Sequence, residues 1–140
     1  MNFMEWFHKP ATKIGFDDVL LAIRNPERFV IINTLSSNEQ DCLIQNTLSA
    51  LDEENTINEM LTQYEQVVRK IVLYGKNATD TTVDKKRAQL NGLGFGDVYI
   101  YSGGLFEWTL LQDIYGEREF PTTKKVVDIL KYKPQNAFHR

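Results

Sequence analysis

The fold is decided by residues 70–108, which begin Lys70-Ile-Val-Leu-Tyr74 and continue Gly75-Lys-Asn-Ala-Thr-Asp80. A segment of helical character follows over residues 81–93, and then a second short apolar run, Val98-Tyr-Ile-Tyr101. A strand, a polar loop, a helix and another strand in this order form a β-loop-α-β unit, which implies a parallel sheet with a right-handed crossover. Parallel sheets carry their chemistry at the carboxyl ends of the strands, so the active-site position is expected at residues 75–80.

Before this unit, the sequence predicts a helix, two strands and a second helix. The first helix carries Phe16, Val19, Leu20 and Ile23 on one face, a spacing of i, i+3, i+4 and i+7. Phe29-Val-Ile-Ile-Asn33 is a continuous apolar run of the length typical of a buried parallel strand. We expect a short strand at residues 42–44 and a helix opening at the capping-box pattern Thr56-Ile-Asn-Glu59. That second helix would present Ile57, Met60, Leu61, Tyr64 and Val68 on one face.

After the unit, Ser102-Gly-Gly104 is a tight turn into an apolar helix that Gly116 ends. A short helix is predicted at residues 126–130. The alternation of helices and short apolar strands indicates an α/β protein. We expect an N-terminal arm over residues 1–13, one domain over residues 14–116 and a C-terminal extension over residues 117–140. The arm contains Phe3, Trp6 and Phe7, which are costly to leave in water.

Composition excludes several classes of function. The 140 residues carry 16 basic and 19 acidic side chains, a net charge of −3, so no global field attracts nucleic acid or an anionic membrane. The basic clusters at residues 85–87 and 124–125 are expected to be solvated faces. A single cysteine, Cys42, allows no intramolecular disulfide. No signal peptide and no apolar run of about 20 residues are seen, so we expect a soluble protein of the cytoplasm.

The ordered motifs resemble the rhodanese-like family. Ile31-Ile-Asn-Thr-Leu35 is similar to the family's Ile-Ile-Asp-Val-Arg. Gly94-Phe-Gly-Asp-Val-Tyr-Ile-Tyr-Ser-Gly-Gly-Leu-Phe-Glu-Trp108 is similar to its Gly-Phe-x-x-Val-Tyr-x-Leu-x-Gly-Gly with a Trp after it. The resemblance covers roughly residues 12–116, and the extension through residues 110–116 and 120–123 resembles a divergent set of such domains in algae, protists and their large viruses. It implies a three-layer α/β/α fold around a central parallel sheet of four to five strands.

The resemblance also implies what the loop would need for sulfur transfer. The family uses a cysteine as the first loop residue, and its thiolate is stabilised by loop N–H groups and the next helix N-terminus. Here that position is Gly75, and the place where the family often has arginine is Asp80 or a neighbour. The spacing from Gly75 to Gly94 is about two residues longer than usual in the family. A persulfide cannot form on glycine, so no catalytic residue is assigned and the related phosphatase chemistry is excluded as well.

Other chemistry-bearing residues have simpler interpretations. Cys42 could be a displaced nucleophile, but a free cysteine is more often buried and structural. Asp80 with its threonine neighbours could assist acid–base chemistry, but at a helix start Asp and Thr usually cap. His8 and His139 lie in terminal segments without a nucleophile beside them, and the acidic run at residues 52–54 is expected to be a solvated loop and not a metal site.

The sequence therefore predicts a catalytically inactive rhodanese-like domain that serves as a binding or regulatory module. The expected partner is a protein or peptide, with no nucleic acid, membrane, cofactor or metal, and the oligomeric state is left open. The alternative is a divergent thiosulfate- or mercaptopyruvate-type sulfurtransferase, or a sulfur carrier, that uses Cys42. The candidate site is the loop that matches the family's active site, and it could hold an anion or an acidic peptide. It consists of Gly75, Lys76, Asn77, Ala78, Thr79 and Asp80.

Overall fold

A four-stranded parallel sheet forms the centre of the protein. The computed structural model describes residues 11–66 and 68–138, so the predictions made for Phe3, Trp6, Phe7, His8 and His139 lie outside the described residues. The strand order is β1-β4-β3-β2 and all three pairings are parallel. The strands are β1 (Thr12–Ile14), β2 (Phe29–Asn33), β3 (Lys70–Tyr74) and β4 (Val98–Tyr101).

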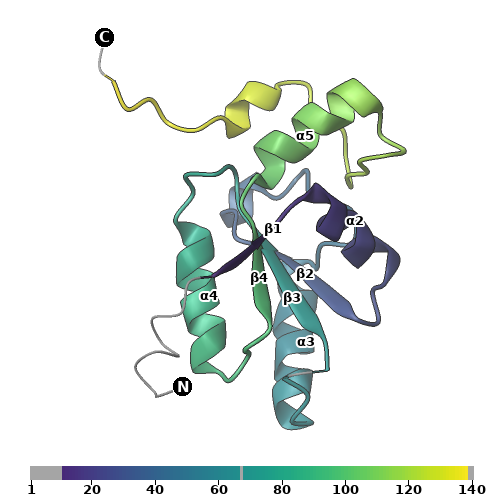
Figure 1. The fold of residues 1–140 in the computed structure, drawn as a ribbon, viewed down its shortest axis with the longest axis vertical. Coiled ribbons are helices and arrows are strands. Elements are labelled where there is room, and N and C mark those ends of the chain that lie inside the picture. Colours follow the sequence, from purple (N-terminus) through teal and green to yellow (C-terminus); the bar gives the residue numbers. More distant parts are fainter. Residues whose placement is uncertain (1–10, 67, 139–140) are drawn as a thin grey trace.

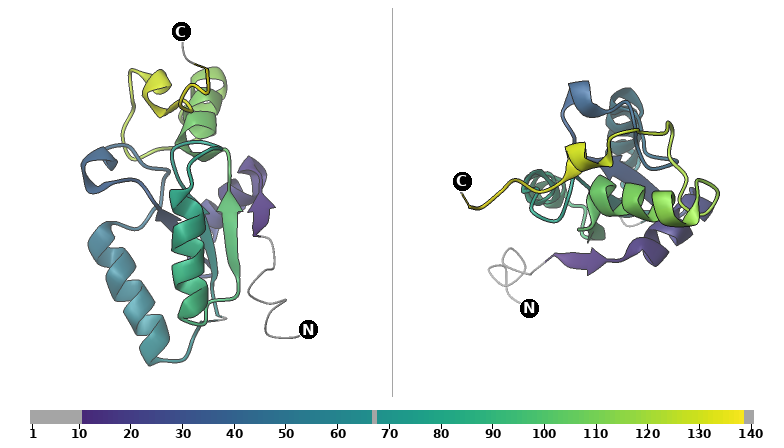
Figure 2. Two further views of the ribbon diagram at one scale, coloured as in Figure 1. Left: turned by 90° about the vertical axis from the view of Figure 1, so that its left-hand side faces the viewer. Right: turned by 90° about the horizontal axis from the view of Figure 1, so that it is seen from above.

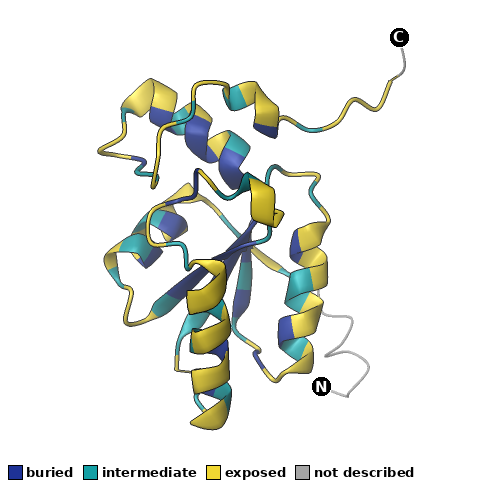
Figure 3. Cartoon of the chain, turned by 180° about the vertical axis from the view of Figure 1, so that it is seen from behind, coloured by how far each residue is buried: buried dark blue, intermediate teal, exposed yellow. Residues whose placement is uncertain are grey.

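Helices cover both faces of this sheet, which gives the three layers (Figure 1, Figure 2). They are α2 (Phe16–Arg24), α3 (Ala50–Thr62), α4 (Thr82–Gly92) and α5 (Gly104–Tyr115). Alternate strand residues point to opposite faces. Val72 and Tyr74 pack with α2 and α5, whereas Ile71 and Leu73 pack with α3 and α4. Figure 3 shows the buried strands between helices whose outer faces are exposed. The predicted α/β/α fold class with a parallel sheet of four to five strands is confirmed.

The carboxyl ends of three strands meet at one edge. Asn33 is in register with Tyr74, and Tyr74 is in register with Tyr101. The loop that begins at Gly75 therefore starts between the ends of two neighbouring strands, where the topology predicted it. No helix of the described residues is long and apolar enough to cross a membrane.

Most elements lie where the sequence placed them. The predictions for α2, β2, β3, α4, β4 and α5 are confirmed, with ends that agree within one or two residues. Gly116 ends α5 with φ of 102°, a conformation that favours glycine.

The predicted strand at residues 42–44 is wrong. Cys42 lies in a bend, and Ile44 forms only an isolated antiparallel bridge with Thr122, outside the sheet. Leu43 exchanges hydrogen bonds with Thr123, at 2.8 Å for the amide of Thr123 on the carbonyl of Leu43 and at 3.1 Å for the amide of Leu43 on Thr123 Oγ1. The C-terminal extension supplies the partner that local sequence could not reveal.

The predicted start of the second helix is also wrong. α3 begins at Ala50, and the Ser49 side chain caps it by accepting from the amide of Asp52 at 3.2 Å. Thr56 lies within the helix. Tyr64, with φ of 55°, and Val68 lie beyond its end and are 87% and 62% exposed. A second capping pattern seven residues upstream was used instead.

The structure differs at both ends of the predicted domain as well. Thr12 and Lys13, assigned to the arm, form the edge strand β1 with Ile14. The C-terminal extension buries Phe120 and Tyr132 in the core, and its helical turn is a 3-10 helix, η2 (Ile129–Tyr132), instead of a helix over residues 126–130. After η2 the chain first passes beside the loop of residues 75–80, and its last described part runs away from the domain (Figure 1).

Candidate functional site

The loop of residues 75–80 connects β3 to α4 and is held from behind by α5. The amides of Leu105 and Phe106 donate to the carbonyls of Gly75 and Lys76 at 3.0 and 2.9 Å. Gly104 allows this close approach, since its φ is +64° and a Cβ there would lie 2.7 Å from the Gly75 carbonyl oxygen. Gly104 is thus needed for the loop to pack against α5, and the loop backbone already uses the amides of Leu105 and Phe106 at the start of that helix.

Gly75 is buried and has no room for a side chain. A Cβ built on it would overlap Asp80 Oδ2 and would lie 2.9 Å from Asp80 Cγ and 3.0 Å from Thr34 Oγ1. The space where a nucleophile would stand is therefore filled by the carboxylate at the other end of the loop.

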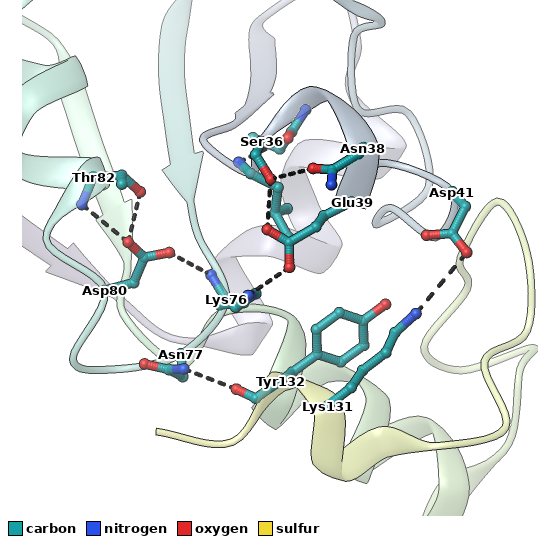
Figure 4. A network of polar contacts seen from close by, with 12 residues as sticks. Ser36, Asn38, Glu39, Asp41, Lys76, Asn77, Asp80, Thr82, Lys131 and Tyr132 are labelled. Carbon is teal, nitrogen blue, oxygen red and sulfur yellow. Dashed lines mark hydrogen bonds and ion pairs between the residues drawn. The ribbon is translucent and has the colours of Figure 1, made fainter. Parts of the chain in front are cut away.

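Asp80 folds back into its own loop. Its Oδ2 accepts from the amide of Lys76 at 2.9 Å, and its Oδ1 accepts from the amide and hydroxyl of Thr82 at 3.0 and 2.6 Å. Figure 4 shows this carboxylate between Lys76 and Thr82. Burial raises the pKa of Asp80, but the hydrogen bonds from Lys76 and Thr82 outweigh it and hold the pKa below its usual value. Asp80 thus caps the start of α4, as the sequence predicted, and occupies donors that an external anion would need.

Thr34, at the end of β2, completes this arrangement and was missed by the sequence analysis. Its amide donates to the Tyr74 carbonyl at 3.0 Å, and its Oγ1 lies 2.7 Å from Thr82 Oγ1. The signal available in the sequence was only that a polar residue follows a buried strand at the sheet's carboxyl end.

Lys76 pairs with an acidic residue of the short 3-10 helix η1 (Ser37–Glu39). Its Nζ lies 2.5 Å from Glu39 Oε2, while Ser36 Oγ donates to Glu39 Oε1 at 2.5 Å. The hydrogen bond from Lys76, with that from Ser36, lowers the pKa of Glu39. Lys76 is therefore already paired in the structure, which reduces its availability to an external anion.

Asn77 connects the loop to the C-terminal extension. Its Nδ2 donates to the Tyr132 carbonyl at 2.8 Å, and its Oδ1 accepts from the amide of Thr79 at 3.0 Å. Ala78 and Thr79 form the exposed tip. The contact with Tyr132 joins residues 55 apart, and no motif in the sequence indicated it.

Two hollows open beside the loop. One of about 650 Å³ lies between residues 76–82, Ser36 and Glu39, and the C-terminal segment from Leu130 to Gln135. The other, of about 430 Å³, is bounded by Asn33, Gln40, Ala50, Glu53, Lys86 and Gln89, among others. Both are lined by polar and apolar side chains.

Cys42 lacks the exposure and the lowered pKa of a reactive thiol. The residue is 1% exposed, and burial raises the pKa of its thiol. Since the thiolate is the nucleophile, a buried thiol with a raised pKa favours the structural interpretation.

The acidic run at residues 52–54 lies on α3 and not in a loop. Glu53 pairs with Lys86 at 2.5 Å. Among residues 11–66 and 68–138, no group of three His, Cys, Asp or Glu side chains is placed to hold a metal ion.

Comparison with known proteins shows the fold. No family model matches the sequence, and no curated protein matches it significantly. A Bacillus halodurans protein of known structure is 21% identical with a TM-score of 0.57, and the alignment covers 81% of this chain and 80% of that one. The rhodanese-like domain of an Anabaena protein is 20% identical with a TM-score of 0.56, over 94% of this chain and 90% of that one. A single-domain sulfurtransferase of Saccharomyces cerevisiae is 13% identical with a TM-score of 0.55, over 77% and 96%. The chain has the rhodanese-like fold.

Proposed function

We propose that this protein is a catalytically inactive rhodanese-like module that acts by binding a protein partner. The observation that carries the proposal is the position of the Asp80 carboxylate, which fills the space above Gly75. A loop built for sulfur transfer needs a thiolate at that point and free N–H donors around it. Here a fixed carboxylate stands at that point, and it accepts hydrogen bonds from the amides of Lys76 and Thr82.

Without a nucleophile, the loop can still bind a partner protein. Asp80 and Lys76 are held by partners within the domain. The tip of the loop, Ala78 and Thr79, is exposed to solvent and accessible to a partner. Rigid loops on a scaffold are common binding elements. The single cysteine is a free thiol, which fits a partner met in the reducing cytoplasm.

Inactivity is tested by a thiosulfate:cyanide sulfurtransferase assay and by intact mass. We expect no turnover above a protein-free blank, and no mass gain of one sulfur atom after incubation with thiosulfate or 3-mercaptopyruvate. Turnover by the purified protein would contradict the proposal. If it is abolished in Cys42→Ser, the sulfur carrier would be Cys42.

Binding through the loop is tested with a matched pair of variants. Ala78→Arg places bulk at the exposed tip without removing a hydrogen bond, and Ala88→Arg makes the same change on the exposed face of α4. We expect a protein captured from cell extract by wild type to be retained by Ala88→Arg and lost with Ala78→Arg. Equal capture by both variants would exclude the loop as the binding element.

A further inference from the structure

The two hollows beside the loop form one trough. They share three lining residues, Thr34, Leu35 and Thr82. The trough therefore runs along the carboxyl edge of the sheet, from the groove between α3 and α4 to the C-terminal segment. Neither hollow is an enclosed cavity, so an extended peptide can lie along the trough, whereas a small molecule would stay largely exposed to solvent.

The trough is locally basic in a protein that is acidic overall. Lysine supplies five lining side chains, whereas carboxylates supply three, Glu39, Glu53 and Asp80. The whole chain has the opposite balance, 16 basic against 19 acidic residues. The lysines are Lys76, Lys85, Lys86, Lys131 and Lys133.

Three of these lysines already have acidic partners within the domain. Lys86 pairs with Glu53 and Lys76 with Glu39, both at 2.5 Å, and Lys131 lies 3.9 Å from Asp41. Figure 4 shows the pairs at the Lys76 end of the trough.

The other two lysines stand one in each hollow. Lys85 lines the hollow between α3 and α4, and Lys133 lines the one beside the C-terminal segment. Both are exposed, and no ion pair of the described residues involves either. Carboxylates of a ligand would meet one uncompensated ammonium group in each hollow.

The rest of the lining favours a peptide over a nucleic acid. Neither hollow has an aromatic side chain on its wall, so nucleobases find no stacking surface. Gln89 and Gln135 present amide groups that can bond a peptide backbone. Leu130, 60% exposed, offers an apolar contact in the second hollow.

We propose that this trough binds an acidic peptide segment of a protein partner, with carboxylates on Lys85 and Lys133 and an apolar side chain on Leu130. This inference rests on the proposed binding function and names the chemistry of its partner. Because both lysines are exposed, the interaction depends on ionic strength.

The test is fluorescence polarisation with a labelled ten-residue peptide that alternates Asp and Glu with two Leu residues. Its neutral Asn/Gln counterpart and a single-stranded oligonucleotide are measured beside it. We expect the acidic peptide to bind and the other two to bind at least about tenfold more weakly, with affinity falling as salt rises. Lys85→Glu and Lys133→Glu should each weaken binding by about fivefold or more, since each reverses a charge that faces the ligand.

Lys124→Glu is the matched control. Lys124 is exposed, lies outside both hollows and should leave affinity within about twofold of wild type. Equal weakening by all three variants would show that binding depends only on the net charge of the protein, and it would overturn the proposal. Tighter binding of the oligonucleotide would overturn it in favour of nucleic acid.

The outcomes separate this inference from the proposed function. Absence of peptide binding, with partner capture still lost in Ala78→Arg, would overturn the trough and leave the binding module. Sulfurtransferase turnover by wild type would overturn the inactive module, whatever the peptides do.

Discussion

The carboxylate of Asp80 occupies the space that a side chain on Gly75 would need. The two residues are five positions apart, and the loop between them closes so that an ideal Cβ on Gly75 overlaps Asp80 Oδ2. Neither position can therefore be interpreted alone. The absence of a nucleophile at one end of the loop and the presence of an acidic residue at the other are parts of one packed arrangement.

The first prediction is that substitutions at these two positions are coupled. Gly75→Cys alone should lower the free energy of unfolding by about 1–3 kcal/mol, because the new side chain is forced against the carboxylate. In an Asp80→Ala background the same substitution should cost at least about 1 kcal/mol less. Urea unfolding of wild type, both single variants and the double variant measures this coupling.

The same four proteins test the loss of activity. We expect Gly75→Cys to show no sulfurtransferase turnover, since its thiol has no place in the loop, and the double variant to be the more easily persulfidated. Additive stability effects, with no coupling, would show that Asp80 does not fill the space above Gly75.

The second prediction concerns pH. The pKa of Asp80 is lower in the folded chain than its unfolded value of about 3.9. Its contribution to stability is therefore fully present above about pH 4 and is lost as the pH falls through the folded-state pKa. Asp80→Asn should be about 1–2 kcal/mol less stable than wild type at pH 7, because an amide cannot accept both sets of hydrogen bonds.

Urea unfolding of both proteins at pH 7 and near pH 3 checks this sign. The stability difference should shrink at the lower pH, because Asp80 of the unfolded wild-type chain then becomes protonated and the contribution of its charge to stability declines. A difference that stays constant would mean that the charge of Asp80 does not contribute.

Local sequence patterns correctly predicted the helices, whose backbone hydrogen bonds lie within the element, and the strands that pair with a neighbour in the sheet. The apolar runs at residues 29–33 and 98–101 are strands because only a buried sheet accommodates them. The 42–44 run could not be told from a strand, since its partner, Thr123, lies about 80 residues away. The start of α3 was misassigned because Ser49 and Thr56 both carry capping signals, and the structure uses Ser49, whose side chain accepts from the amide of Asp52.

The sequence predicted where the candidate site lies in the fold, but not how its side chains are arranged. Topology places residues 75–80 at the carboxyl edge, and Asp80 was expected to cap α4. The direction in which its carboxylate turns depends on Gly104 bringing α5 against the loop. The trough depends on Tyr132 anchoring the C-terminal extension beside Asn77, a long-range contact with no local signature.

The third prediction contrasts two buried tyrosines. The hydroxyl of Tyr74 lies 3.0 Å from the Ile44 amide, which donates to it, and 2.7 Å from Thr47 Oγ1. The hydroxyl of Tyr132 is buried without a hydrogen bond of ordinary geometry, and its polar neighbour is the Cys42 thiol, a weak hydrogen-bonding group. Tyr74→Phe should therefore cost about 1–3 kcal/mol, because it leaves a buried amide unpaired, whereas Tyr132→Phe should be neutral within about 0.5 kcal/mol or stabilising.

Chemical denaturation of the two variants measures the contrast, with Tyr64→Phe, at an 87% exposed position, as the control. A loss for Tyr132→Phe as large as that for Tyr74→Phe would show that the Tyr132 hydroxyl has a partner after all.

The last prediction tests how the loop is seated. Gly104→Ala adds a Cβ 2.7 Å from the Gly75 carbonyl oxygen and 2.9 Å from the Asn77 amide nitrogen, at a φ of +64°. The left-handed backbone and the overlap should together lower the free energy of unfolding by about 2–4 kcal/mol. Gly92→Ala, at the end of α4 with nothing within 4 Å of its Cβ, should be neutral or stabilising by up to about 1 kcal/mol. Because the strain falls on the backbone of the loop, amide hydrogen exchange at residues 75–80 should quicken in Gly104→Ala before the whole domain unfolds. A variant as stable as Gly92→Ala, with unchanged exchange in the loop, would show that α5 does not fix the conformation in which Asp80 closes the site.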